Sequence, residues 1–296
     1  MVKQVILPPD FNEKEIAKFI HDVIGPDGFP RESEILFDFS KLRFVDGVGL
    51  TVLCNTIDWL MHKKIRCIFH IGQKYLNDYL VYMDDCGFFE KYTNTPLRPH
   101  RAVRDTTLPI KKIDHAHSQA WMDFHFTPWM CIKLNVNKNK LSSLKTCINE
   151  IFNNIKDHSS FNEGFIHVQH YPRINRIDIS ISDIGVGIPS NIKRKYGEMS
   201  DKDAILKASQ EGVTSKSHPN NMGIGLDYLS VTVASNGGRV SIHSGYGLYL
   251  CRPDRNGLDR ESFQMDAMYP GTLVDIQLPI ERFIGDEEGE EEEFEW

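Results

Sequence analysis

Long apolar runs are missing from this sequence, since no stretch approaches the roughly 20 apolar residues that a membrane-spanning helix requires. The N-terminal residues, MVKQVILPPD, also lack the apolar core of a secretory signal peptide. The six cysteines lie far apart and form no C-x-x-C pair. We therefore expect reduced thiols, without a disulfide framework or a structural zinc site. These absences predict a cytoplasmic protein, typical of prokaryotes, with no membrane partner.

The charge is distributed unevenly along the chain. The net charge is −7, but residues 285–296 hold eight acids and no base. The remainder has 33 acids against 34 bases and is close to neutral, which argues against a nucleic-acid partner. We predict that the segment 285–296 is a solvated, disordered acidic tail. A docking role for its aromatic residues, Phe294 and Trp296, is the alternative.

The length of 296 residues, of which 41% are apolar, favours two domains with a substantial core. Residues 1–95 alternate between strand and helix patterns, with strands near 35–39 and 67–71 and a helix over 48–61 between them. Asn12 is a suitable cap for a further helix over 13–23. Three prolines then indicate a linker over 96–114, and a second α/β alternation occupies 115–284.

A polar row lies beside the apolar stripe of one predicted helix in the second domain. The stripe consists of five residues at three- and four-residue steps, namely Leu141, Leu144, Ile148, Ile151 and Ile155. Glu150, Asn154 and Asp157 follow at i, i+4 and i+7, on one line next to that stripe. Asn154 offers a neutral oxygen to Mg²⁺, and Glu150 could orient or deprotonate a water. The alternative is an ordinary exposed helix edge.

Two predicted strands each carry a polar residue in core register. Residues 176–183 alternate between apolar and polar side chains, as in a strand with one buried face. Asp183 lies an even number of residues from the isoleucines, so its side chain points to the same face as theirs. A buried, unpaired carboxylate is costly, and the amino group of adenine is a suitable donor to it. Thr272 has the same parity as the apolar residues that follow it in its strand. Gly185 and Gly187 would allow the backbone to approach a base closely.

A glycine pair precedes another predicted helix, over 226–234. Gly223, Gly225 and Leu226 open this helix, and free N–H groups at a helix N-terminus can bind phosphate. The residues before them, 190–222, separate this pair from Gly185 and Gly187 and include Lys216. The alternative for both features is a solvated loop that leads into a helix.

Three motifs resemble, in their order and spacing, the N, G1 and G2 boxes of the GHKL ATPases, over about residues 134–279. They are the segments Glu150–Asn154, Asp183–Gly187 and Gly223–Leu226. The resemblance implies an α/β sandwich that binds Mg²⁺ and ATP, with a mixed sheet and helices on one face. It also implies that Asp183 recognises adenine, that Thr272 assists it and that Glu150 acts in the reaction. The family's ATP lid corresponds to residues 190–222, in which Lys216 could reach the terminal phosphate when the lid closes.

The segment ILFDFSKLRFVDGVGL resembles the strand, loop and helix of STAS domains, the fold of anti-sigma-factor antagonists. Asp38, Asp46 and Gly49 occupy the expected positions. The antagonists carry a phosphorylatable serine between the second aspartate and the glycine. This chain has Gly47 and Val48 there, so we expect no phosphorylation switch at the loop.

The sequence therefore predicts a two-domain α/β protein, STAS-like then GHKL-like, that binds ATP and Mg²⁺ and has a protein partner. Its activity would be that of an ATPase switch or of a serine/threonine kinase that resembles the anti-sigma factors. The alternative is a non-catalytic module whose nucleotide state controls partner binding. The acceptor and the oligomeric state remain open, with a homodimer as one alternative.

Overall fold

The structure is a computed structural model that describes residues 2–25, 28–72, 76–159, 162–213, 225–255 and 257–286, without the side chains of residues 157 and 158. The predicted acidic tail therefore lies almost wholly outside the description. Among the residues described, no helix is both long and apolar enough to cross a membrane.

The N-terminal unit is an α/β layer built on a parallel sheet. Its main strands are β1 (Val2–Ile6), β3 (Glu34–Asp38) and β5 (Arg66–His70), in the order β1-β3-β5. The short strands β2 (Asp10–Phe11) and β4 (Phe44–Val45) form a separate pair. Its helical elements are η1 (Glu13–Glu15), α1 (Ile16–Val23), α2 (Gly47–His62), α3 (Asp78–Asp85) and α4 (Phe88–Thr93). The strands and helices predicted in this unit are confirmed, with shifts of one or two residues.

Side-chain caps explain where the first helices of this unit begin. Asn12 accepts a hydrogen bond from the backbone N–H of Lys14 at 3.0 Å. Asp46 accepts one from the N–H of Gly49 at 2.8 Å and so caps α2. Both carboxamide and carboxylate oxygens satisfy backbone donors that a helix N-terminus leaves free. The local sequence thus determines both helix starts.

The C-terminal unit contains a five-stranded sheet in the order β6-β7-β8-β10-β9. The strands are β6 (Thr107–Asp114), β7 (Glu163–Tyr171), β8 (Arg176–Asp183), β9 (Arg239–Asp254) and β10 (Gly257–Pro279). Each neighbouring pair is antiparallel. The α/β class is confirmed, whereas the mixed sheet expected from the resemblance is corrected to an antiparallel one among the described strands.

Helices of the C-terminal unit pack on one face of this sheet or at its end. They are α5 (His115–Trp121), the π-helical turn η2 (Met122–Phe126), α6 (Thr127–Leu134), α7 (Ser142–His158), α8 (Gly187–Tyr196), α9 (Asp201–Ala208) and α10 (Leu226–Ser235). Short 3₁₀ turns are η3 (Lys138–Leu141), η4 (Pro172–Ile174) and η5 (Ile280–Arg282). The stripe of α7 packs with Ile177, Ile179 and Ile181 of β8 in one core.

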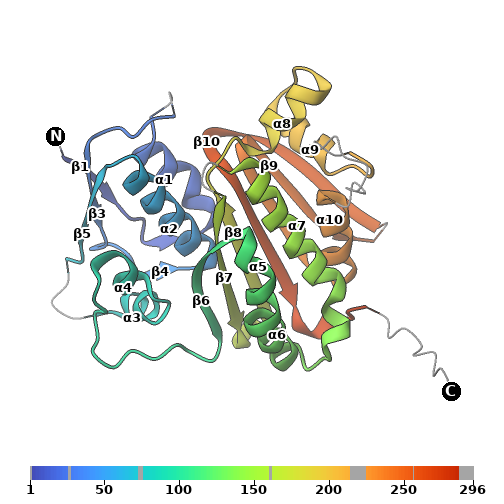
Figure 1. Ribbon diagram of the computed structural model, residues 1–296, viewed down its shortest axis with the longest axis horizontal. Helices are drawn as coiled ribbons and strands as arrows, with labels where there is room; N and C mark the ends of the chain where they lie inside the picture. The colour runs from blue at the N-terminus through green and yellow to red at the C-terminus, as the bar shows by residue number, and fades with distance from the viewer. Residues whose placement is uncertain are drawn as a thin grey trace.

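The two units share a continuous interior. Figure 1 shows α1 and α2 between the three-stranded sheet and the five-stranded sheet, and α2 contacts β7 and β8 while α1 contacts β10. Phe165, Tyr269 and Leu273 of the larger sheet belong to the same apolar core as the N-terminal unit. The five-stranded sheet is therefore covered on both faces, by helices from two different units.

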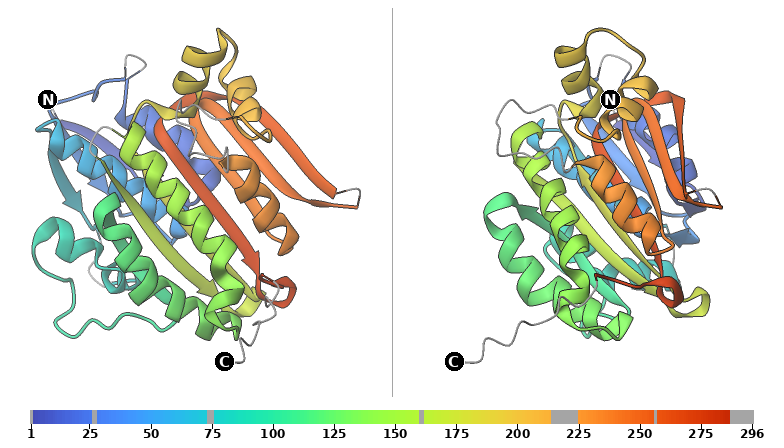
Figure 2. Two further views of the ribbon diagram at one scale, coloured as in Figure 1. Left: turned by 45° about the vertical axis from the view of Figure 1, so that its right-hand side comes forward. Right: turned by 90° about the vertical axis from the view of Figure 1, so that its right-hand side faces the viewer.

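Two segments differ from the sequence-based expectation. Residues 107–114, assigned to the linker, form β6 and pair with β7. Residues 246–269, whose proline, glycine and charge content predicts an inserted excursion between two strands, extend β9 and β10 into a long hairpin. Figure 2 shows this hairpin projecting beyond the helices. In both segments, pairing with a neighbouring strand satisfies the hydrogen bonds of the backbone N–H and C=O groups. No local sequence pattern predicts this pairing.

Candidate functional site

Asp183 ends β8 and is 7% exposed. Its position after Ile177, Ile179 and Ile181 places it on the face of the sheet that α7 covers. Burial raises the pKa of the Asp183 carboxyl to about 7, and no described partner offsets this cost by a hydrogen bond or an ion pair. A buried acceptor without a partner is the chemical signature of a site for a donor group.

Thr272 lies directly opposite Asp183, because the two residues are partners in the β10–β8 register. On the other side of β10, Thr272 is paired with Ser244 of β9, and their hydroxyl oxygens lie 3.3 Å apart. We call these three residues the end row. The strand register thus places Thr272, which the resemblance implies as an assisting residue, next to Asp183. Ser244 was missed, although the pattern Val240, Ile242, Ser244 carries the same parity signal.

The loop after β8 is held tightly by the end row. Ser244 Oγ donates to the carbonyl oxygen of Gly271 at 2.5 Å and accepts from the N–H of Ile188 at 2.9 Å. Gly187 has φ of +75°, and a Cβ there would meet Ser244 Oγ at 2.7 Å. Gly187 therefore has a packing reason to be glycine, besides the close approach to a ligand that the sequence suggests. Gly185 donates its N–H to the carbonyl oxygen of Pro270 at 3.3 Å.

The helix α7 carries the predicted polar row towards this loop. Glu150 and Asn154 are both half-buried on α7. Ser159, the first residue after the helix, forms an isolated antiparallel bridge with Gly185. At about 1.5 Å of rise per residue, Asn154 lies some 7.5 Å along the axis from that bridge. The backbone of Asp157 is in α7, but its side chain is outside the description.

The predicted phosphate-binding segment is described only at its end. Gly225 precedes α10, and Leu226 is half-buried between two apolar clusters. Lys216 and Gly223 lie outside the described residues. Arg260 of the hairpin donates to the carbonyl oxygen of Ser209 at 2.8 Å and to Asp227 Oδ1 at 2.6 Å. It thereby links the end of α9 to the start of α10, a role that no sequence motif indicates.

A buried chain of hydrogen bonds connects the N-terminal unit to the strand that ends in Asp183. Asn55 of α2 donates to Ser182 Oγ at 2.7 Å, and Ser182 is also hydrogen-bonded to the hydroxyl of Tyr269. Ser182 precedes Asp183 and faces the opposite side of the sheet. The N-terminal unit therefore contacts β8 on the face of the sheet opposite to the Asp183 side chain.

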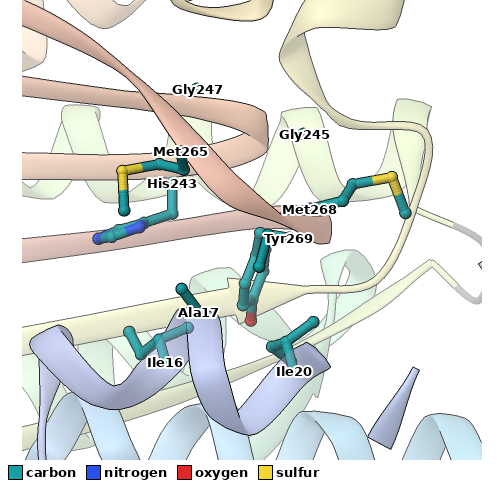
Figure 3. Close-up of a pocket in the computed structure, with 10 residues that line it drawn as sticks. Ile16, Ala17, Ile20, His243, Gly245, Gly247, Met265, Met268 and Tyr269 are labelled. Atoms are coloured by element: carbon teal, nitrogen blue, oxygen red, sulfur yellow. The ribbon is translucent and has the colours of Figure 1, made fainter. Parts of the chain in front are cut away.

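Two cavities lie on the side of the sheet that faces the N-terminal unit. Figure 3 shows the smaller one, where Tyr269 and Met268 of β10 meet Ile16 and Ile20 of α1. Its volume of about 10 Å³ has room for a water at most. The larger cavity, of about 460 Å³, lies between Trp59 of α2, loop residues 184–186 and Lys193 of α8. Neither cavity is lined by Glu150, Asn154 or Asp183.

No group of three or more His, Cys, Asp or Glu residues that could hold a metal ion is found in the described part of the chain. The Asp183 carboxylate of the end row, which has no hydrogen-bond or ion-pair partner among the described residues, fits the donor edge of a base.

No protein-family model matches the chain, and no curated protein matches it in sequence. The ATPase region of Saccharomyces cerevisiae topoisomerase II bound to ICRF-187 (dexrazoxane) is similar at 12% identity and a TM-score of 0.30, covering 52% of this chain and 42% of that one. The topoisomerase IV ATP-binding domain of Francisella tularensis, in complex with a small-molecule inhibitor, is similar at 17% identity and a TM-score of 0.27, covering 49% and 39%.

This chain therefore spans less than half the length of either matched structure. The similarity extends over about half of this chain, and it assigns no residue a role. The resemblance of residues 1–95 to STAS domains has no counterpart in these comparisons and stays a prediction.

Proposed function

We propose that this protein binds Mg²⁺ and ATP at the end row and hydrolyses the nucleotide as a switch. The observation that carries the proposal is Asp183, whose buried carboxylate has no described partner. The 6-amino group of adenine supplies the donor that this carboxylate lacks. Thr272, held opposite Asp183 by the strand register, offers a hydroxyl to the same base.

Two polar residues of α7 would act near the phosphates of the nucleotide. Asn154 would contribute a neutral oxygen to Mg²⁺, while phosphate oxygens and waters complete the shell. Glu150, one helical turn earlier, would take a proton from the attacking water. When bound, Mg²⁺ neutralises charge on the phosphates; the chain's own residues bind the base and orient the water. Lys216 and Gly223 remain predictions from the sequence.

Water is favoured over a serine of the N-terminal unit as the acceptor. The loop where STAS antagonists carry their phosphoserine is buried here, because Val48 is 4% exposed and Gly47 packs against His167 and Ser180 of the large sheet. A kinase activity would require a separate protein substrate, and a partner of that kind stays a prediction, as does a homodimer.

The experiment is a titration of the nucleotide-free protein with non-hydrolysable analogues of ATP and GTP. We expect the parent to prefer the adenine analogue, because the corresponding edge of guanine presents a carbonyl oxygen to Asp183. Asp183→Asn should weaken binding of the ATP analogue about tenfold or more, as loss of a charged hydrogen bond is worth roughly 1.5–3 kcal/mol.

Asp178→Asn is the matched control, because Asp178 lies on the same strand but on the opposite face, where it pairs with Arg176. It should leave the affinity for the nucleotide unchanged. Equal affinities of parent and Asp183→Asn, or no base preference, would remove the adenine role of Asp183. Binding without any release of ADP would instead favour the non-catalytic module.

A further inference from the structure

A chain of side-chain hydrogen bonds ends on Glu150. Asn153, three residues further along α7, donates from Nδ2 to Glu150 Oε1 at 3.0 Å. The amide oxygen of Asn153 lies 2.7 Å from Nε2 of His115. Three residues from two helices are thus connected, and only Glu150 was singled out by the sequence as a reacting group.

The direction of these bonds follows from the chemistry of the amide. An asparagine side chain has one donor end and one acceptor end. Since its N–H group is directed at Glu150, its oxygen faces His115, and Nε2 of the imidazole must carry a hydrogen. Every donor in the chain therefore points towards the Glu150 carboxylate, and the last hydrogen bond holds Oε1.

His115 is itself fixed by local structure. It is the first residue of α5, whose N-cap Asp114 accepts a hydrogen bond from the N–H of His117 at 2.9 Å. Ser118 Oγ donates to the carbonyl oxygen of His115 at 2.8 Å. A second link between the same two helices joins Asn149 Nδ2 to Gln119 Oε1 at 3.1 Å. The imidazole is therefore presented to α7 from a helix that is aligned along it.

We propose that His115 and Asn153 are positioning residues that hold the Glu150 carboxylate in the orientation required to activate water. The inference rests on the proposed hydrolysis of ATP. His115 acts through Asn153 and touches neither nucleotide nor water. Without the pair, the glutamate side chain would sample several rotamers, and only a fraction of them would place Oε2 near the reacting atoms.

The test measures steady-state ATP hydrolysis and, separately, the affinity for a non-hydrolysable ATP analogue. We expect His115→Ala and Asn153→Ala to lower kcat by about 10- to 100-fold, the range typical when a partner that orients a metal-ligating side chain is lost. The analogue's Kd should change less than twofold, and the melting temperature should stay near that of the parent. His115→Gln, which keeps an N–H donor, should recover most of the lost kcat.

Asn149→Ala is the matched control, because it breaks the other α5–α7 link without touching Glu150; its kcat should equal the parent's. In a Glu150→Ala background, His115→Ala should have no further effect, since nothing remains to be positioned.

The inference is overturned if His115→Ala behaves like Asn149→Ala, or if it lowers kcat equally with and without Glu150. These results would leave the hydrolysis of ATP by the parent intact. A parent that releases no ADP would overturn the proposed reaction and the positioning role together. Failure of the inference and failure of the function are thus distinguishable.

Discussion

At the residue scale, the alternation of side chains along each strand determines which polar groups point into the candidate site. Asp183 lies two residues after Ile181, so the same pleat that buries the isoleucine also buries the carboxylate. Thr272 and Ser244 occupy the equivalent positions on β10 and β9, which places three polar groups in one row. Asn154 reaches the same end of the molecule through the period of α7. Each side chain is therefore oriented by a repeat of two or of 3.6 residues.

Asn154 gives the prediction at this scale. Asn154→Ala should abolish the Mg²⁺-dependent part of nucleotide binding while the fold survives, because the residue is half-buried beside the apolar stripe of α7. Saturating Mg²⁺ and ATP analogue, at about 100 times Kd, should stabilise the parent by about 2.7 kcal/mol. Thermal unfolding with the analogue, in Mg²⁺ and in EDTA, is the measurement. A variant that keeps the parent's full Mg²⁺-dependent shift would exclude Asn154 as the ligand.

At the scale of elements, the start of α2 shows how the two units are fitted together. A Cβ on Gly47 would lie 3.0 Å from Nδ1 of His167 and 3.3 Å from Ser180 Oγ. His167 cannot move away easily, because its Nε2 lies 3.2 Å from the hydroxyl of Tyr82 and the ring is 1% exposed. A side chain at position 47 therefore meets a steric obstacle, because the start of α2 packs against the large sheet.

We predict that Gly47→Ala destabilises the protein by about 1–3 kcal/mol, the usual cost of overpacking a core. The cost should shrink when it is measured in a His167→Ala background, because the alanine then has room. Urea unfolding of the four proteins in this double-mutant cycle gives the coupling. An identical cost of Gly47→Ala in both backgrounds would show that His167 is not the obstacle.

At the scale of the whole molecule, the large sheet has an apolar face towards α7, whereas its face towards the N-terminal unit holds a layer of buried polar residues beside Phe165, Tyr269 and Leu273. Ser180 Oγ donates to Asp275 Oδ1 at 2.8 Å in this polar layer. Burial raises the pKa of Asp46 to about 7, and the charge of Asp275 adds to the effect. Burial likewise raises the pKa of Asp275. Acidic groups are thus packed between the units, where ionisation is unfavourable.

The stability of the nucleotide-free protein should therefore fall as the pH rises from about 5 to 7.5. In the unfolded chain Asp46 titrates near its ordinary value of 3.8, so between that value and about 7 the folded state holds more protons. His167, whose pKa burial lowers to about 3, acts in the opposite sense but only below its ordinary value of 6.5. Urea midpoints measured across this range test the prediction.

Asp275→Asn should make the decline shallower, because an amide does not titrate. The replacement keeps an oxygen that can accept from Ser180, so the hydrogen bond need not be lost. Stability that increases through neutral pH in the parent, or a slope that the variant leaves unchanged, would contradict this account of the polar layer.

Much of the fold and part of the site follow from short-range patterns in the chain. Strand alternation, helical periodicity and capping residues such as Asn12 and Asp46 act over a few residues, so β8, α2 and α7 and the faces of Asp183 and Asn154 could be predicted. The same reasoning could not find β6. Residues 107–114 include Pro109, which argues against a strand, and the segment becomes a strand only through pairing with β7.

The remaining features depend on which distant segments meet. Asn55 and Ser182 are 127 residues apart in sequence, and His115 and Asn153 are 38 apart. A polar side chain alone does not reveal its partner, because the partner is selected by topology: by the antiparallel register, by α5 lying along α7 and by α2 covering the second face of the sheet. Local periodicity thus sets which way each residue points, and long-range packing sets what it touches.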